Sequence, residues 1–246
     1  MSKSFLCVLA LGICGLVRPV GAQEELCDSA CLKGIAADYM AALVAKDWST
    51  LPWGDKVSFS ENAVAMMIGE GLWGPDVSIE GIPFIAADPV SGNAVWFGVV
   101  TEHGQAAYYG MRLQVENRRI TQVETLLGRE GTPGTFTAPE HYAVAAEFSD
   151  TLPIEARRPR ERLIALVDGY FGSKQLNDGV LLSVFAADCA RTINGTSTTH
   201  GSAHWAAQAV QGCQPQLETG LYKPVDRIRE RHFPVVDESR GLVVAI

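Results

Sequence analysis

The chain has 246 residues, of which 47% are hydrophobic and 20% are charged, as is typical of a globular protein. Its formal net charge of -8 argues against nucleic acid as the main partner, because phosphate binding needs a basic face. The sequence has no GxSxG elbow, no GxGxxG after a predicted strand and no P-loop. Serine hydrolase, nicotinamide and nucleotide chemistry are therefore unsupported.

The N-terminus has the features of a secretory signal peptide, predicted over residues 1–22. Lys3 provides the positive charge, residues 5–16 form an apolar run, and Val20-Gly21-Ala22 is a small-residue cleavage site. The apolar run is too short to span a bilayer, and no later segment has the roughly 20 apolar residues that a span requires. We therefore expect the protein to be secreted or to lie in the lumen of the secretory pathway.

Four cysteines follow the predicted signal peptide: Cys27, Cys31, Cys189 and Cys213. An even number in an oxidising compartment indicates two disulfides, but four cysteines allow three pairings and the sequence does not choose among them. We favour Cys27–Cys31 with Cys189–Cys213, because each bond then lies within one half of the chain. No C-x-x-C pair is present, and no metal site is predicted.

The first half, residues 23–132, predicts a helix followed by an antiparallel sheet. The apolar residues Leu32, Ile35, Tyr39 and Leu43 favour an amphipathic helix over 28–46, with Asp28 or Ser29 as its N-cap. A pair of strands is predicted around Glu61-Asn62, and a meander over 94–102, 106–116 and 119–129. A helix before a curved antiparallel sheet indicates an α+β fold.

Alternating apolar residues also set the register of the last predicted hairpin. Matching the apolar faces of the two strands requires a three-residue loop, Asn117-Arg118-Arg119. This register places Arg112 opposite Glu124 and Gln114 opposite Gln122. The Arg–Glu pair is either a structural pair on the outer face or, in a pocket, an oxyanion donor and a base.

A Pro-, Thr- and Arg-rich stretch, residues 133–160, is predicted to be a linker with a short helix around 142–148. The second half, residues 161–246, repeats patterns of the first. "LKGIAADY" and "LIALVDGY" share Leu-x2-aliphatic-x3-Tyr, while "FIAADPVSG" and "FPVVDESRG" share Phe-x3-Asp-x3-Gly. The repeat predicts a second unit that lacks its last strands. Its open edge would reflect an early stop or be covered by a partner chain.

Three segments, "FSENAVAMMIGEGLW", "YYGMRLQVENRRITQVETLLGR" and "FAADCARTINGTSTT", resemble a group of secreted SnoaL-like proteins of fungi and bacteria. These proteins belong to the nuclear transport factor 2-like superfamily, which includes the ketosteroid isomerases. The resemblance implies two α+β units, each a cone of helices inside a bent antiparallel sheet. The second unit would be incomplete at its C-terminus.

The resemblance also implies a class of chemistry. Active members are mostly cofactor-free isomerases, cyclases, dehydratases or lyases that act on apolar small molecules. Some serve polyketide or maleidride pathways, where they are linked to cyclising dimerisation. We therefore expect a cofactor-free acid/base enzyme of this kind. The alternatives are a secreted carrier of a small ligand and an interaction module that forms a homodimer through its sheet.

Five residues are candidates for the catalytic machinery: Tyr39, Arg112, Glu124, Asp188 and Arg191. Tyr39 could donate a hydrogen bond to a substrate carbonyl or be a core tyrosine, and Tyr170 is its counterpart in the second half. Arg191 could hold a substrate carboxylate or pair with Asp188.

Other polar residues have weaker assignments. Glu61 and Asn62 are expected to shape a turn. Asn194-Gly195-Thr196 is an N-glycosylation sequon. His200 and His204 have helical i, i+4 spacing but lack the neighbouring Glu of a zinc motif, and His103 is expected to be exposed in a hairpin turn.

Overall fold

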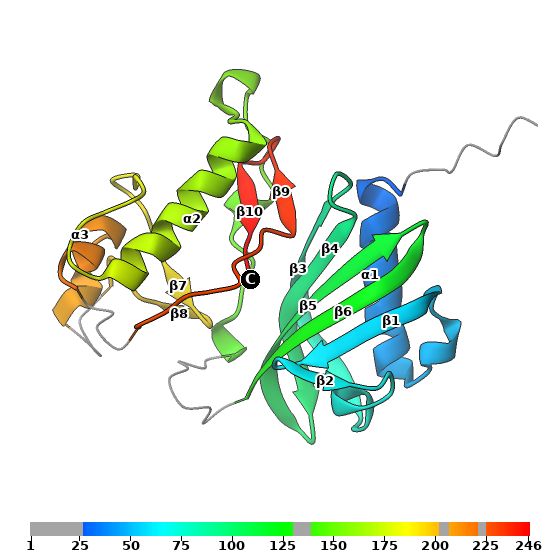
Figure 1. Ribbon diagram of the computed structural model, residues 1–246. Helices are drawn as coiled ribbons and strands as arrows, with labels where there is room; N and C mark the ends of the chain where they lie inside the picture. Colours follow the sequence, from blue (N-terminus) through cyan, green and yellow to red (C-terminus); the bar gives the residue numbers. More distant parts are fainter. Residues whose placement is uncertain (1–26, 130–138, 202–206, 221–224) are drawn as a thin grey trace, which may run out of the picture.

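The computed structural model describes residues 27–129, 139–201, 207–220 and 225–246. In the first half, helix α1 packs against one face of a curved six-stranded sheet (Figure 1). The helix covers Ser29–Ala45. The strands are β1 (Trp53–Glu61), β2 (Val64–Met66), β3 (Val77–Asp88), β4 (Asn93–Glu102), β5 (Gln105–Glu116) and β6 (Arg119–Arg129). The predicted α+β class is confirmed.

The sheet has the order β2-β1-β6-β5-β4-β3. Strands β4 to β6 form the predicted antiparallel meander, and β3, which the sequence analysis did not predict, extends it as a further antiparallel strand. Strand β1 lies parallel to β6, so the sheet is mixed rather than purely antiparallel. Side chains alternate between the two faces of the sheet along β5 and β6. Those on one face pack in the core with α1, and those on the other face point away from it.

Helix α1 forms as its sequence predicts. The Asp28 side chain accepts a hydrogen bond from the Cys31 N–H (2.8 Å) and is the N-cap. The helix ends at Lys46, which adopts a left-handed conformation. Its buried face carries Leu32, Tyr39 and Leu43, all without exposed surface. The Cys27–Cys31 disulfide closes the first turn, and Cys189–Cys213 forms in the second half. The favoured pairing is thus confirmed.

The β5–β6 hairpin corrects one detail of the predicted register. Its loop has two residues, Asn117 and Arg118, both with positive φ, as a type I′ turn requires. A bulge beside Gln114 then restores the register further along the strands. The predicted pairing of Arg112 with Glu124 is therefore confirmed, although the predicted three-residue loop is wrong.

Of the short helix predicted around 142–148, the structure shows only a 3₁₀ helix over its last three residues. Short 3₁₀ turns cover Pro139–His141 (η3) and Ala146–Phe148 (η4). Between them the Tyr142 hydroxyl donates to the Phe97 carbonyl (2.8 Å) and accepts from the Phe84 N–H (3.2 Å). These bonds to strands β4 and β3 hold the segment against the sheet, which explains why a continuous helix does not form.

The second half begins with α2 (Arg160–Leu176) and ends with the hairpin β9 (Val235–Asp237) and β10 (Leu242–Val244). Between them lie β7 (Thr192–Ile193), β8 (Thr196–Ser197), the 3₁₀ turn η6 (Ala207–Val210) and α3 (Cys213–Glu218). In this intervening stretch the described residues form only the two-stranded ladder β7–β8, whose turn at Asn194 has positive φ, as the β1–β2 turn at Asn62 does. Among its described residues, the second half therefore has two separate two-stranded ladders in place of one large sheet.

The repeated sequence patterns adopt similar local structures. Helices α1 and α2 have 17 residues each, with Leu at the fourth position and Tyr at the eleventh. Each helix contacts its own hairpin, β3–β4 or β9–β10. In both hairpins an Asp ends the first strand and its carboxylate accepts the N–H two residues later, at Val90 (2.9 Å) and Ser239 (3.0 Å). The glycine that closes each turn has positive φ.

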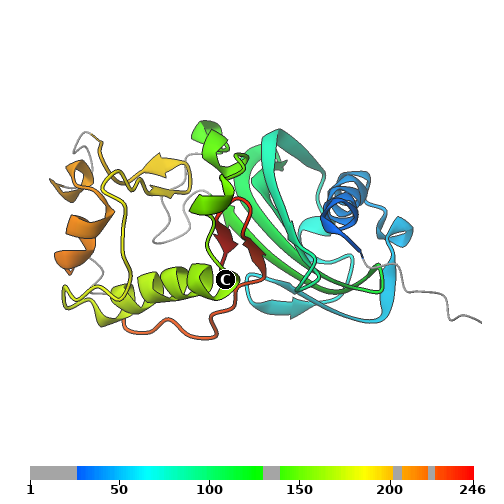
Figure 2. The same ribbon diagram turned by 90° about the horizontal axis from the view of Figure 1, so that it is seen from above.

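The two hairpins pack against each other, as Figures 1 and 2 both show. An apolar cluster of Ala86, Val95, Val235 and Leu242 fills the contact. Beside it lies Asp88, whose side chain is only 2% exposed. Its Oδ2 pairs with Arg160 Nη2 at the start of α2 (2.6 Å) and accepts the Val236 N–H of β9 (3.0 Å). One carboxylate therefore joins the first half to two elements of the second.

Burial alone would raise the pKa of Asp88, but the hydrogen bonds from Arg160, Val236 and Val90 outweigh it and hold the pKa below its usual range. A carboxyl with a depressed pKa stabilises the fold above its unfolded-state pKa of about 3.9. This contribution is lost as the pH falls below that value, because protonation removes the charge that Arg160 needs.

Asp88→Asn should lower the free energy of unfolding by about 3 kcal/mol, because it leaves Arg160 half-buried without its anion. Urea denaturation at neutral pH measures this loss. When the pH falls below 4, the free energy of unfolding should also decrease less in the variant than in the wild type, because the variant has no Asp88 carboxylate to protonate. Asp38→Asn on the exposed face of α1 is the matched control and should change stability by less than about 0.5 kcal/mol. Equal effects of the two substitutions would contradict the role given to Asp88.

Candidate active site

A cluster of hydrogen-bonding side chains lies between α1 and the sheet. The Tyr39 hydroxyl of α1 accepts a hydrogen bond from Trp73 Nε1 (3.2 Å) and is hydrogen-bonded to the Tyr109 side chain of β5. Tyr39, Trp73 and Tyr109 are all at least 97% buried. Tyr39 faces inward because it follows Leu32 by two helical turns, and Tyr109 because it alternates with Tyr108 and Gly110 along the strand.

Burial keeps both phenols neutral. It raises the pKa of Tyr39 above its ordinary value, and hydrogen bonds from Trp73 and Tyr109 reverse only part of that shift. Burial also raises the pKa of Tyr109, with a further contribution from Tyr39 and from the negative charge of Glu61. Neutral phenols donate hydrogen bonds and do not act as bases. The pair is therefore suited to stabilise a negatively charged oxygen.

Glu61 is the carboxylate that acts on both phenols. It ends strand β1 and is 6% exposed. Its Oε2 accepts the Leu72 N–H (3.1 Å) within the 3₁₀ turn η2 (Gly71–Trp73). Its Oε1 forms no hydrogen bond to another described residue. Glu61 thus provides one fixed oxygen and one that is available to a proton, whereas the sequence predicted only a role in a turn.

Asn62, next to Glu61, has the structural role that the sequence predicts. With Ala63 it forms the positive-φ turn between β1 and β2. Its side chain bonds both the N–H (2.9 Å) and the carbonyl (3.1 Å) of Leu127. Asn62 therefore fixes the end of β1, and with it the position of Glu61.

The turn η2 covers this cluster, and Gly71 at its start allows the backbone to lie close to the Glu61 carboxylate. A Cβ on Gly71 would lie 2.9 Å from both carboxylate oxygens of Glu61, and its φ of +63° disfavours any other residue. Trp48 packs edge-on against Trp73 (centroids 5.9 Å apart) and remains 41% exposed. On this side, Trp48 and Trp73 therefore lie between the solvent and Tyr39.

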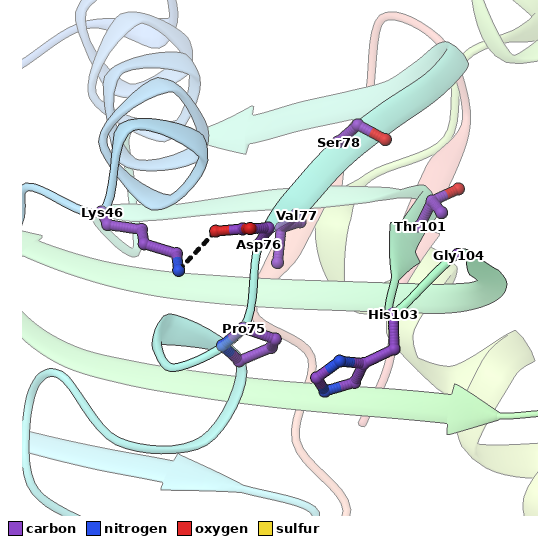
Figure 3. Close-up of a pocket in the computed structure, with 8 residues that line it drawn as sticks. All are labelled: Lys46, Pro75, Asp76, Val77, Ser78, Thr101, His103 and Gly104. Carbon is purple, nitrogen blue, oxygen red and sulfur yellow. Dashed lines mark ion pairs between the residues drawn. The ribbon is translucent and has the colours of Figure 1, made fainter.

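A pocket of about 580 Å³ opens beside the same loop (Figure 3). Its wall combines Lys46 at the end of α1, Pro75-Asp76-Val77 after η2, and His103 in the β4–β5 turn. Lys46 Nζ pairs with Asp76 (2.5 Å) at the surface. His103 is exposed in a hairpin turn with positive φ, as predicted. Val77 lines the pocket and is also part of the core cluster.

Arg112 and Glu124 lie on the outer face of the sheet, away from Tyr39. Arg112 Nε donates to Glu124 Oε2 (2.9 Å), and its Nη1 donates to Asn93 (3.1 Å). His232 of the second half approaches the same Glu124 oxygen (3.4 Å). The neighbours Met111, Leu113, Val123 and Thr125 face the core, so the pleat excludes Arg112 and Glu124 from the interior cluster.

The candidate residues of the second half form a separate group. Arg191 Nε donates to Thr198 Oγ1 (2.8 Å), and Nη2 donates to Gln216 Oε1. Asp188 is exposed. Tyr170 is half-buried, and the Lys174 ammonium lies 5.4 Å from the centre of its ring. The structure thus distributes the five predicted catalytic residues over three places and leaves Tyr39 as the one in the interior.

The remaining residues that the sequence analysis named are Asn194, His200 and His204, and the first two are not part of the interior cluster. Asn194 lies at the tip of the β7–β8 hairpin with positive φ. His200 Nε2 lies 3.0 Å from the Cys189 carbonyl, while His204 falls outside the described residues. No group of three or more His, Cys, Asp or Glu side chains suited to a metal ion occurs in the part of the chain that the structure describes.

Sequence reasoning missed Tyr109, Trp73 and His232. Tyr109 carried a usable signal, because the alternation along β5 already assigned it to the inward face. Trp73 and His232 carried none, since each meets its partner only through the folding of distant segments: Trp73 with Tyr39, and His232 with Glu124.

Comparison with protein families gives one match, a domain of unknown function named DUF8021, over residues 156–246. This match covers only the second half of the chain. No curated protein matches the chain.

The similar solved structures include proteins of the NTF2-like fold that the sequence resembles. A Kribbella flavida protein provisionally assigned as a ketosteroid isomerase has 14% identity and a TM-score of 0.37, covering 55% of this chain and 98% of its own. A Shewanella putrefaciens protein provisionally assigned as a SnoaL-like polyketide cyclase has 19% identity and a TM-score of 0.34, covering 48% and 92%. An NTF2-like protein of unknown function from Cytophaga hutchinsonii has 9% identity and a TM-score of 0.30, covering 38% and 86%. Similarities at this level carry no argument about activity.

Gly71→Ala should destabilise the protein by about 2 kcal/mol, because it combines an unfavourable positive φ with a collision against the Glu61 carboxylate. Urea denaturation measures the loss, and near-ultraviolet circular dichroism should report a changed environment of Trp73. Gly74→Ala is the matched control three residues later. Its φ is -73° and its added Cβ would meet no atom closer than 3.4 Å. A Gly71→Ala protein as stable as the control would show that Glu61 does not hold η2.

Proposed function

We propose that the protein is a cofactor-free acid/base enzyme of the isomerase, cyclase or lyase type that acts on an apolar small molecule. The observation that carries the proposal is the interior cluster, in which two neutral phenols and an indole N–H lie beside a carboxylate with an available oxygen. This combination supplies an oxyanion site and a base, which enolisation requires. The resemblance to ketosteroid isomerase-like proteins adds support from the sequence.

The simplest reaction for this geometry is an allylic isomerisation. Glu61 removes a proton from the carbon next to a substrate carbonyl, and the negative charge moves to the carbonyl oxygen. Tyr39 and Tyr109 stabilise that oxygen by hydrogen bonds. Glu61 then returns the proton to another carbon, so the atoms balance without a cofactor. In a cyclase or lyase, the same enolate would attack a second carbon or expel a leaving group.

The substrate would enter from the side of η2. The cluster is buried, and the loop that follows η2 forms part of the pocket in Figure 3. Displacement of Trp73 and Pro75 would connect that pocket with Tyr39. The apolar side chains between them favour an apolar substrate, since a charged one would lose its hydration there.

We also propose that the protein enters the secretory pathway and that Asn194 is glycosylated. The signal-like N-terminus and the two disulfides support a protein of the secretory pathway. Among the described residues, no helix has the length and apolarity to cross a membrane. The position of Asn194 at a hairpin tip is compatible with glycosylation in a eukaryotic host.

Tyr39→Phe should lower turnover about 100-fold and leave the fold intact, because it removes one oxyanion donor without changing the volume of the core. The assay follows the conversion of 3-cyclohexenone and of a bicyclic β,γ-unsaturated ketone to the conjugated enones by ultraviolet absorbance. Glu61→Gln should abolish turnover, because the amide still accepts the Leu72 N–H but cannot take a proton.

Tyr170→Phe is the matched control for Tyr39→Phe, since it changes the counterpart tyrosine on α2. It should retain full turnover. A wild-type protein that binds the enones without converting them would favour the alternative function, a carrier of small ligands. Turnover unaffected by both Tyr39→Phe and Glu61→Gln would exclude the interior cluster as the active site.

A further inference from the structure

A second concave site lies at the junction of the two halves, on the edge strand of the sheet. This cavity has a volume of about 600 Å³. Residues 82–85 of β3 form one wall, residues 142–146, 148 and 149 of the linker form the other, and Arg240 of the β9–β10 turn completes the lining. The volume and the predominantly apolar lining are those of small-molecule sites, which often occur where domains meet. We call it the junction groove.

A bulge in β3 shapes one wall of the groove. The pairing of β3 with β4 shifts between Glu80 and Phe84, and Gly81 has positive φ within the shifted segment. The bulge takes Ile82 out of the regular ladder and leaves it 80% exposed. β3 is also the edge of the sheet, so this wall has no neighbouring strand to cover it.

The opposite wall is fixed rather than loosely attached. Tyr142 bonds to the backbone of both β3 and β4 and packs against the rings of Phe97 (5.5 Å) and Tyr108 (6.0 Å). Further along, the Phe148 ring, 47% exposed, packs edge-on against Phe84 (5.5 Å). Two walls held by hydrogen bonds and ring contacts form a groove that exists before a ligand arrives, which lowers the entropic cost of binding.

Among the described residues that line the groove, Arg240 is the one that carries a charge. Its Nε pairs with Asp237 (2.7 Å), and its Nη1 donates to the Phe148 carbonyl (3.1 Å). Its Nη2 has no hydrogen-bond partner among the described residues. Because Asp237 and Phe148 fix the guanidinium, one planar N–H₂ group remains available in a defined position. It is suited to donate hydrogen bonds to a carboxylate or phenolate oxygen.

We propose that the junction groove binds a small aromatic anion, with the ring between Ile82 and Phe148 and the acidic group on Arg240. Aromatic side chains on both walls favour a planar ring, and the remaining Nη2 donor of Arg240, beside its pair with Asp237, favours an acidic oxygen as acceptor. The site is separate from the interior cluster: it lies on the edge of the sheet and outside the α1 face. It therefore does not depend on the proposed enzymatic function.

Isothermal titration of the full-length protein with 2-naphthoate tests the groove. One molecule should bind per chain, and 2-naphthylmethanol, which has the same ring without the charge, should bind about 10-fold more weakly. The neutral ligand is preferred to a substitution of Arg240, because Arg240 also supports the β9–β10 turn.

Ala145→Phe should fill the groove and weaken 2-naphthoate binding at least 10-fold. Ala145 lines the groove and is exposed, so the larger side chain displaces no core residue. Ala156→Phe, at an exposed linker alanine outside the groove, is the matched control and should bind as the wild type does. Tyr39→Phe should also bind normally, which separates this site from the interior cluster. No saturable binding up to 1 mM, or binding that Ala145→Phe leaves unchanged, would overturn the proposal.

Discussion

The buried carboxylate of Asp88 is the contact on which the arrangement of the two halves depends. It lies at the end of β3, and it binds the first residue of α2 and the backbone of β9 at the same time. A carboxylate in such surroundings is stable only when its partners are in place, because an unpaired buried charge costs several kcal/mol. Asp88 therefore selects one docking of the second half, while the apolar contact beside it supplies the non-directional attraction.

The pleat of the sheet separates two kinds of chemistry. Inward positions carry Tyr109 and Thr125 among apolar residues, and with Tyr39 they form a dry, neutral hydrogen-bonding cluster. Outward positions carry Arg112 and Glu124, whose opposite charges pair with each other and where His232 approaches. Only the inward group combines donors with low dielectric surroundings. Electrostatic stabilisation of a developing charge is effective under those conditions.

The second half reuses the elements of the first for a different purpose. Its helix and hairpin have the same local design, including the Asp carboxylate that binds its own turn. The described residues of the second half form no large sheet behind this helix, and Tyr170 is only half-buried, whereas Tyr39 has no exposed surface. The hairpin instead packs on β3 and β4 and carries Arg240 to the junction groove. Similar sequence patterns thus give a packed interior in one half and a docking element in the other.

The sequence by itself determined the local features: the capped helix α1, the meander of β4 to β6, the pairing of Arg112 with Glu124, and the inward direction of Tyr39. Helical and strand periodicity and turn residues encode these features within short segments. The tertiary structure decided which of them meet. Three contacts join segments far apart in the chain, and no local pattern specifies them: Trp73 with Tyr39, Asp88 with Arg160, and His232 with Glu124. For the same reason the sequence could name candidate residues for a site but could not show that Arg112 and Tyr39 lie on opposite faces of one sheet.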